Sequence, residues 1–187
     1  MELKYEGQEF YDLEISGFHR RLPVVQVDDN LWIASFVMLG DVNLVNFCAG
    51  ALAPKLSKLD FDYLVGPEAK VIPLLQALGT FLGQSHYVVC RKNVKNYMED
   101  PVMIEVDSIT SQGKQKLVLN GIDVEKIIGS KVVIVDDVVS TGGTFSSLEK
   151  LMEKIGTEIV GKAAVLKEGG RYDKDLIYLQ DLPVFKR

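Results

Sequence analysis

The sequence has few cysteines, no long apolar run and no excess of positive charge, and each absence excludes a class of protein. Cys48 and Cys90 do not make a disulfide scaffold or a metal site, and we expect both to pack in the interior. No apolar run approaches the ~20 residues needed to cross a membrane, and the acidic, polar residues 1–17 do not fit a signal peptide. A net charge of −5 argues against a nucleic-acid partner. We therefore expect a cytoplasmic protein that binds neither membranes nor nucleic acid.

Repeats, linkers and low-complexity tracts are also missing, so the 187 residues predict one domain that is large enough to bury a core. Strand and helix patterns alternate along it, which indicates an α/β fold with a mostly parallel sheet between helices. Ligands of such sheets sit beyond the carboxyl ends of the strands. The expected strands are 22–27, 31–37, 63–65, 87–90, 102–110, 115–120, 132–135 and 159–166, and the expected helices are 41–56, 73–83 and 144–155.

Residues 132–144 carry most of the chemical information. Four β-branched apolar residues run into Asp136 and Asp137, two valines follow, and residues 140–144 are all small. The pattern predicts a buried strand, an acidic turn and a glycine-rich loop that opens a helix. The unpaired amides and the dipole at a helix N-terminus bind a phosphate, and the two adjacent carboxylates need a cation or a polyhydroxylated ligand.

Two common phosphate-binding motifs do not fit this loop. It lacks the lysine of a P-loop, and its glycine spacing differs from that of a dinucleotide-binding turn. An ordinary turn capped by Thr144 would explain the glycines but would leave Asp136 and Asp137 repelling each other without a partner. A phosphorylated sugar together with Mg²⁺ fits both halves of the motif.

The segment resembles the 5-phosphoribosyl-1-pyrophosphate (PRPP) motif of type I phosphoribosyltransferases. The resemblance implies their single-domain fold, with a hood over about residues 1–38, a core over 39–187 and a mobile loop with a β-hairpin over 92–120. It makes Asp136 and Asp137 the catalytic pair, which holds the ribose hydroxyls directly or through Mg²⁺, an ion held mainly by PRPP. The residues that it assigns to the 5-phosphate are Val139, Ser140, Thr141, Gly142, Gly143 and Thr144.

Two further segments are similar to the pyrophosphate-binding parts of adenine phosphoribosyltransferases. Residues 66–70 follow a strand and open a helix, with Lys70 where the family usually has arginine, and the family's cis peptide would fall near Glu68-Ala69. A basic loop then follows the strand 87–90. The residues expected at the pyrophosphate are Glu68, Ala69, Lys70, Arg91, Lys92 and Lys95.

The identity of the acceptor base stays open at this point. In the mobile hairpin Ser111 stands where adenine enzymes carry a glutamate, and residues 108–111 and 117–121 also resemble xanthine phosphoribosyltransferases. An inward-pointing Lys167 would favour an oxo-purine, whereas Glu168 would favour adenine. The candidate base-binding residues are Phe18, Leu22, Leu166, Lys167 and Glu168.

Overall similarity favours a purine-salvage enzyme that converts adenine and PRPP to AMP and pyrophosphate with Mg²⁺ as cofactor, and the family implies a homodimer. One alternative is a xanthine, hypoxanthine or guanine phosphoribosyltransferase. An alternative of another class is a non-catalytic, PRPP-binding regulatory protein.

Overall fold

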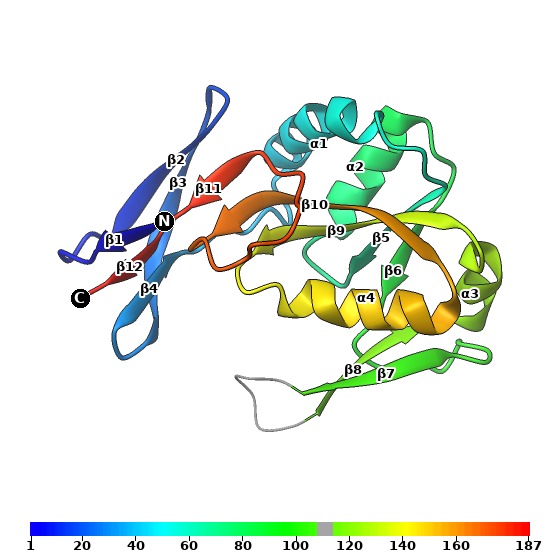
Figure 1. The fold of residues 1–187 in the computed structure, drawn as a ribbon. Coiled ribbons are helices and arrows are strands. Elements are labelled where there is room, and N and C mark those ends of the chain that lie inside the picture. The colour runs from blue at the N-terminus through cyan, green and yellow to red at the C-terminus, as the bar shows by residue number, and fades with distance from the viewer. Residues whose placement is uncertain (108–113) are drawn as a thin grey trace.

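The computed structural model describes residues 1–107 and 114–187 and contains a helix-flanked core, a smaller hood sheet and a projecting hairpin (Figure 1). Within this described part, the core sheet has the order β11-β10-β9-β5-β6, and every neighbouring pair in it is parallel. Its strands are β5 (Tyr63–Pro67), β6 (Tyr87–Cys90), β9 (Lys131–Val139), β10 (Glu158–Glu168) and β11 (Gln180–Leu182). The predicted parallel sheet is therefore confirmed.

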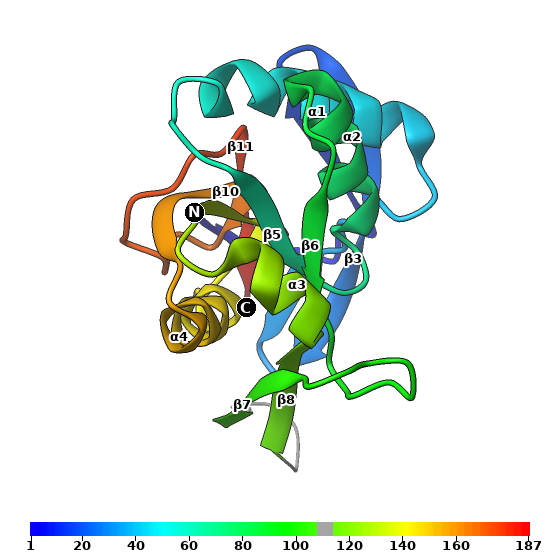
Figure 2. The ribbon, with the colours of Figure 1, turned by 90° about the vertical axis from the view of Figure 1, so that its right-hand side faces the viewer.

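Helices cover both faces of this sheet because its strands are apolar on both sides. Along β9, Val133 and Val135 pack with the buried face of α1 and α2, whereas Val132 and Ile134 pack with α4 on the opposite face. Figure 2 shows the sheet between the two groups of helices. The helices are α1 (Val42–Leu56), α2 (Ile72–Leu82), α3 (Gly121–Ile127) and α4 (Gly143–Ile155), of which α3 was not predicted.

Local residues determine where the predicted helices begin and end. Asp41 caps α1 by accepting a hydrogen bond from the Leu44 amide at 3.0 Å, as its side chain predicts. Gly83 and Gly156 end α2 and α4 with φ of 69° and 86°, in the left-handed region that glycine adopts without strain. α4 begins at Gly143, one residue before the expected start at Thr144, and Gly142 occupies its N-cap position.

A second sheet forms the hood and has the order β1-β12-β4-β3-β2 among the described residues. Four of its strands come from the N-terminus, but β12 lies between β1 and β4, so the C-terminal strand belongs to the hood as well. Arg20 of this sheet donates to Asp41 at the start of α1, with its Nε 2.8 Å from Oδ2. The strands are β1 (Glu2–Lys4), β2 (Phe10–Ile15), β3 (Phe18–Asp28), β4 (Leu31–Ala34) and β12 (Val184–Lys186).

The predicted hairpin consists of the antiparallel strands β7 (Val102–Asp107) and β8 (Lys114–Leu119), and it packs beside α4. Arg91 extends the pairing beyond β6 through two 2.8 Å backbone hydrogen bonds with Val118. Ser111 and the rest of the turn lie outside the described residues. Across the ranges 1–107 and 114–187, no helix is both long and apolar enough to span a membrane.

Candidate functional site

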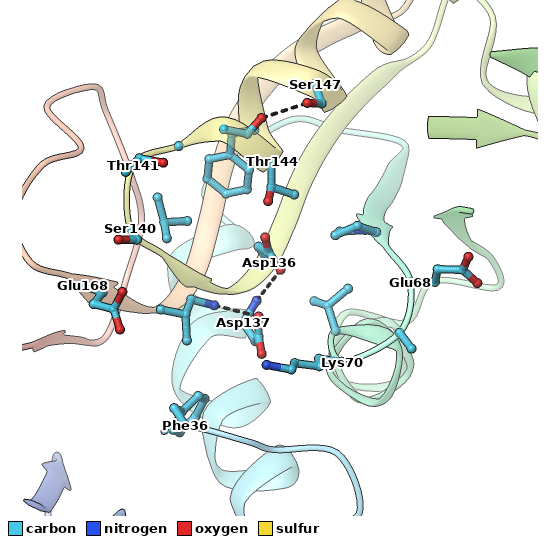
Figure 3. Close-up of a pocket in the computed structure, with 18 of the residues that line it drawn as sticks. Phe36, Glu68, Lys70, Asp136, Asp137, Ser140, Thr141, Thr144, Ser147 and Glu168 are labelled. Carbon is cyan, nitrogen blue, oxygen red and sulfur yellow. Dashed lines mark hydrogen bonds between the residues drawn. The ribbon is translucent and has the colours of Figure 1, made fainter. Parts of the chain in front are cut away.

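A cavity of about 630 Å³ lies where the carboxyl ends of the core strands face the hood (Figures 1 and 3). The motif segment, the loop after β5, the start of the basic loop and the end of β10 all contribute to its lining. The predicted site residues that line it are Glu68, Ala69, Lys70, Lys92, Asp136, Asp137, Val139, Ser140, Thr141, Gly142, Gly143, Thr144 and Glu168. Residues separated by up to 100 positions in the sequence thus meet in one cavity.

Asp136 and Asp137 lie at the carboxyl end of β9 and are 8% and 7% exposed. Asp136 accepts a hydrogen bond from the Asp137 amide, and Asp137 Oδ1 accepts one from the Val138 amide, both at 2.9 Å. Burial, and then the neighbouring charge of Asp137, raise the pKa of Asp136 well above its usual value. The second oxygen of Asp137, Oδ2, is buried without a hydrogen-bond partner among the described residues. A buried oxygen in this state is ready to accept a ligand hydroxyl or a cation.

The small-residue loop delivers the N-terminus of α4 to the cavity. Gly142 takes φ of 82° at the N-cap, and within the described structure no side chain caps the helix. The Ser147 hydroxyl donates a hydrogen bond to the Gly143 carbonyl at 2.9 Å. It therefore does not occupy the backbone amides of the first turn of α4. Because these amides carry the positive end of the helix dipole, the loop suits an anion.

A second helix N-terminus, that of α2, borders the same cavity. Val71 is its N-cap and, among described residues, it also receives no side-chain cap, while Pro73 stands in the first turn. The Glu68-Ala69 peptide before it is cis, at the position where the family resemblance implied one. Lys70 points toward Asp137 (Figure 3), and its charge acts on both Asp136 and Glu168. The acid pair therefore lies between two sites that favour anions.

The basic loop enters the cavity only in part. Arg91 places its Nε 2.6 Å from Glu68 Oε2, and the Lys92 amide donates to Glu68 Oε1 at 2.6 Å. Lys92 lines the cavity, whereas neither Arg91 nor Lys95 is among its described lining residues. The positive charge of Arg91 is thus offset by a carboxylate of the neighbouring loop.

Of the candidate base-binding residues, Glu168 alone lies among the described lining residues. Burial raises the pKa of its carboxyl, and the hydrogen bond with Ser140 and the charge of Lys70 oppose that shift. Lys167 instead places its ammonium 5.7 Å from the centre of the Tyr178 ring. Phe18 stacks on Phe47 at 4.5 Å. Leu22 and Leu166 are buried in the apolar core.

Several lining residues were missed by the sequence reasoning. Phe36 is 4% exposed and lies across the cavity from the loop 140–144, near Lys70 and Asp137 (Figure 3). Lys116 reaches the cavity from the hairpin. The signal for Phe36 was only its place just after a hood strand, in the expected strand 31–37. The missed residues of the hood, hairpin and β11 are Ile33, Ala34, Ser35, Phe36, Lys116, Leu117 and Leu182.

Among the described lining residues, the carboxylates that the cavity offers a metal ion are those of Glu68, Asp136, Asp137 and Glu168. No cluster of three or more His, Cys, Asp or Glu residues able to hold a metal occurs within residues 1–107 and 114–187. The unpartnered Asp137 Oδ2 and the adjacent Asp136 fit a hard cation such as Mg²⁺, which takes one or two carboxylates and completes its shell with water and substrate oxygens. The residues therefore fit Mg²⁺ that is bound jointly with a substrate.

The chain matches a protein family described as "Phosphoribosyl transferase domain" over residues 48–183. It is 32% identical over 151 residues to the adenine phosphoribosyltransferase of Thermosipho africanus, a match that covers 75% of the chain and 79% of that enzyme. It is 36% identical over 115 residues to the hypoxanthine/guanine phosphoribosyltransferase of Methanothermococcus okinawensis, which covers 62% of the chain and 58%, less than two thirds, of that relative.

A solved structure, the adenine phosphoribosyltransferase of Thermoanaerobacter pseudethanolicus, superposes with a TM-score of 0.65 at 26% identity. That alignment covers 77% of this chain and 84% of the solved one. The names of these similar proteins divide between adenine and hypoxanthine/guanine as the purine base.

Proposed function

The chain belongs to the phosphoribosyltransferase family, and we propose that it transfers the 5-phosphoribosyl group of PRPP to a purine, with adenine as the preferred base. One observation carries this proposal: the buried acid pair Asp136-Asp137 lies between two uncapped helix N-termini in one cavity. PRPP has the matching order of groups, a phosphate, a ribose with two hydroxyls, and a pyrophosphate.

The two ends of PRPP would occupy the two helix N-termini. The loop Ser140–Thr144 and the amides of α4 take the 5-phosphate, with Val139 as part of the loop's start. The loop from Glu68 to Lys70 and the start of α2 take the pyrophosphate, with Lys92 and Lys116 adding charge from the basic loop and the hairpin. The ribose lies between these two ends, and its hydroxyls donate hydrogen bonds to Asp136 and Asp137.

The chemistry that Mg²⁺ would supply here is positive charge that offsets the negative charge building on the departing pyrophosphate. Asp136 and Asp137 are the residues of this chain that would hold it. The pKa of Asp136 is raised by burial and by Asp137, so a cation or a pair of hydroxyl donors at this point stabilises two carboxylates that otherwise repel each other.

The reaction forms a bond between a purine nitrogen and C1 of the ribose as the bond from C1 to the pyrophosphate oxygen breaks. Positive charge develops on the ribose and negative charge on the leaving group. Asp136 and Asp137 favour the first, while Lys70 and the α2 amides favour the second. Phe36 is buried and lines the cavity, where it would limit the access of water to the ribose. Positioning and electrostatics thus contribute more than proton transfer.

Glu168 supports adenine as the acceptor. Its carboxylate faces the cavity and can accept a hydrogen bond from the exocyclic amine of adenine, whereas the 6-oxygen of hypoxanthine would face an acceptor and leave both groups unpaired. Lys167, the donor that would favour an oxo-purine, lies instead over Tyr178. The similarity to a hypoxanthine/guanine relative keeps an oxo-purine as the second candidate.

The test is a panel of adenine, hypoxanthine, guanine, xanthine and orotate, each offered with PRPP and Mg²⁺ and followed by pyrophosphate release. We expect release with adenine and much slower release with the three oxo-purines and with orotate. Turnover of hypoxanthine or guanine alone would replace adenine by the second candidate. PRPP binding without release on any base would instead support the regulatory, non-catalytic alternative.

A further inference from the structure

Tyr172 packs against Gly142 in the loop 140–144. It is 4% exposed, and its ring meets Phe145 of α4 edge to face at 5.9 Å between centroids. The ring also covers the Cα of Gly142, the N-cap residue of α4. A Cβ atom added to Gly142 would overlap the Tyr172 ring and lie only 2.6 Å from its Cε2. Ring and loop are therefore in contact at Gly142, the first of the two glycines of the loop.

The segment that carries Tyr172 turns sharply just after Glu168. Gly169 and Gly170 adopt φ of 66° and 73°, and the Gly170 amide donates to the Glu168 carbonyl at 2.8 Å. Such left-handed conformations are open to glycine at little cost. The turn brings the chain from the cavity to the back of the loop, so one short segment contacts the site from two sides.

Beyond Tyr172, the segment is fastened to the core. Lys174 places its Nζ 3.4 Å from Oε2 of Glu149 on α4, and Lys162 of β10 also pairs with Glu149. The Ile177 amide donates to the Lys162 carbonyl at 2.9 Å. Before Tyr172, the Gly169 amide donates to the Leu182 carbonyl at 2.9 Å, so the backbone is bound to the core sheet on both sides of the ring.

We propose that Tyr172 is a positioning residue for the phosphate-binding loop, and this proposal rests on the proposed function. The ring supports Gly142 in its left-handed conformation, which directs the first amides of α4 at the 5-phosphate. Tyr172 acts through the loop backbone and touches no substrate. The Tyr172 hydroxyl faces Lys162, whereas its ring contacts Gly142, so we expect the ring to carry the effect on the loop.

The test measures binding of ribose 5-phosphate by calorimetry, together with KM for PRPP and kcat. We expect Tyr172→Leu to weaken ribose 5-phosphate binding and to raise KM for PRPP by about tenfold to a hundredfold, since small displacements of a positioning group have effects of that order. Tyr172→Phe keeps the ring and should restore binding to within about twofold of the unchanged chain. Tyr178→Leu, which removes a ring from the same segment but away from the loop, is the matched control and should bind normally.

A double-mutant cycle separates positioning from general packing. Gly142→Ala should weaken binding in both backgrounds, because its φ of 82° disfavours any side chain, but by less in the Tyr172→Ala background, where the overlap with the ring is gone. Additive losses in a folded double variant, or normal ribose 5-phosphate binding by Tyr172→Leu, would overturn the positioning role alone. If the unchanged chain binds neither ribose 5-phosphate nor PRPP, the proposed function falls with it.

Discussion

The Nε atom of Arg91 lies 2.6 Å from Oε2 of Glu68, and the Lys92 amide donates to the other oxygen of the same carboxylate. The loop before α2 and the basic loop are thereby joined at the place proposed for pyrophosphate. Glu68 would repel pyrophosphate if its charge were not offset. We therefore expect Arg91 to favour pyrophosphate binding by neutralising Glu68 and not by contacting the ligand itself.

Removing Arg91 tests this difference. Arg91→Ala should raise KM for PRPP by about tenfold, because it leaves an uncompensated carboxylate beside an anion. Adding Glu68→Gln should recover a large part of that loss, since the repulsive charge is then gone. The measurement is KM for PRPP in both variants at fixed adenine. A double variant that is no better than Arg91→Ala would indicate that Arg91 contacts the pyrophosphate itself.

The acid pair should be required for turnover and dispensable for folding. We expect Asp136→Asn combined with Asp137→Asn to lower kcat/KM by at least about a hundredfold, through loss of electrostatic stabilisation at the ribose. The melting temperature should not fall, because the substitution removes repulsion between two buried carboxylates. Asp60→Asn, a change at the surface carboxylate that pairs with Lys131, is the control and should leave kinetics unchanged.

Glu168 and Lys167 give opposite predictions for the base. Glu168→Gln should impair use of adenine by about tenfold, because an acceptor that reads the exocyclic amine becomes a partly mismatched amide. Lys167→Gln should change adenine use by less than about twofold, since its ammonium lies over Tyr178 and not in the cavity. The readout is kcat/KM for adenine and for hypoxanthine in each variant. A selective loss of hypoxanthine turnover in Lys167→Gln would favour an oxo-purine site.

Asp41 joins the hood to the core and should make stability depend on pH. Its pKa is held below the usual value, first by the hydrogen bond from Arg20 and then by the Leu44 amide. A carboxyl whose pKa is lower in the folded state stabilises that state above its unfolded pKa of ~4, and the contribution is lost as pH falls through the folded value. Asp41→Ala should therefore cost about 1 kcal/mol near pH 7 and less below pH ~4.

Asp41→Asn separates the two contributions of Asp41. Asparagine still caps a helix, so this variant loses only the ion pair with Arg20, a partly exposed contact worth about 0.5 kcal/mol or less. Urea unfolding of both variants across this pH range is the measurement. An equal loss in the alanine variant at pH 3 and pH 7 would show that the charge of Asp41 contributes nothing to folding.

The sequence predicted the features that depend on neighbouring residues. The apolar strand before Asp136 was predicted, and so were the helix ends near residues 41, 83 and 155, where Asp41, Gly83 and Gly156 form the caps. Glu168 was a candidate because it follows the expected strand 159–166, and ligands of parallel sheets bind beyond the carboxyl ends of the strands. Local chemistry and one topological rule were sufficient for these predictions.

The features that were missed depend on packing between distant segments. Phe36 lines the cavity because the hood folds over the core. Phe18, the aromatic residue that the sequence suggested for the base, stacks on Phe47 instead. Arg91 and Glu68 form an ion pair although they lie 23 positions apart on two different loops. The sequence pattern of either loop alone does not indicate this pairing. The C-terminal strand β12 joins the hood through pairing with β1 and β4. It has only three residues, which is too short for an alternating pattern to predict a strand.

The most direct test of the proposed function follows AMP and pyrophosphate together when the chain is given adenine, PRPP and Mg²⁺. Equal amounts of both products should form with the unchanged chain, and neither should form above background with the folded Asp136→Asn, Asp137→Asn variant. Equal product formation by that variant, or PRPP consumption without AMP in the unchanged chain, would contradict the assignment of the acid pair and of the reaction.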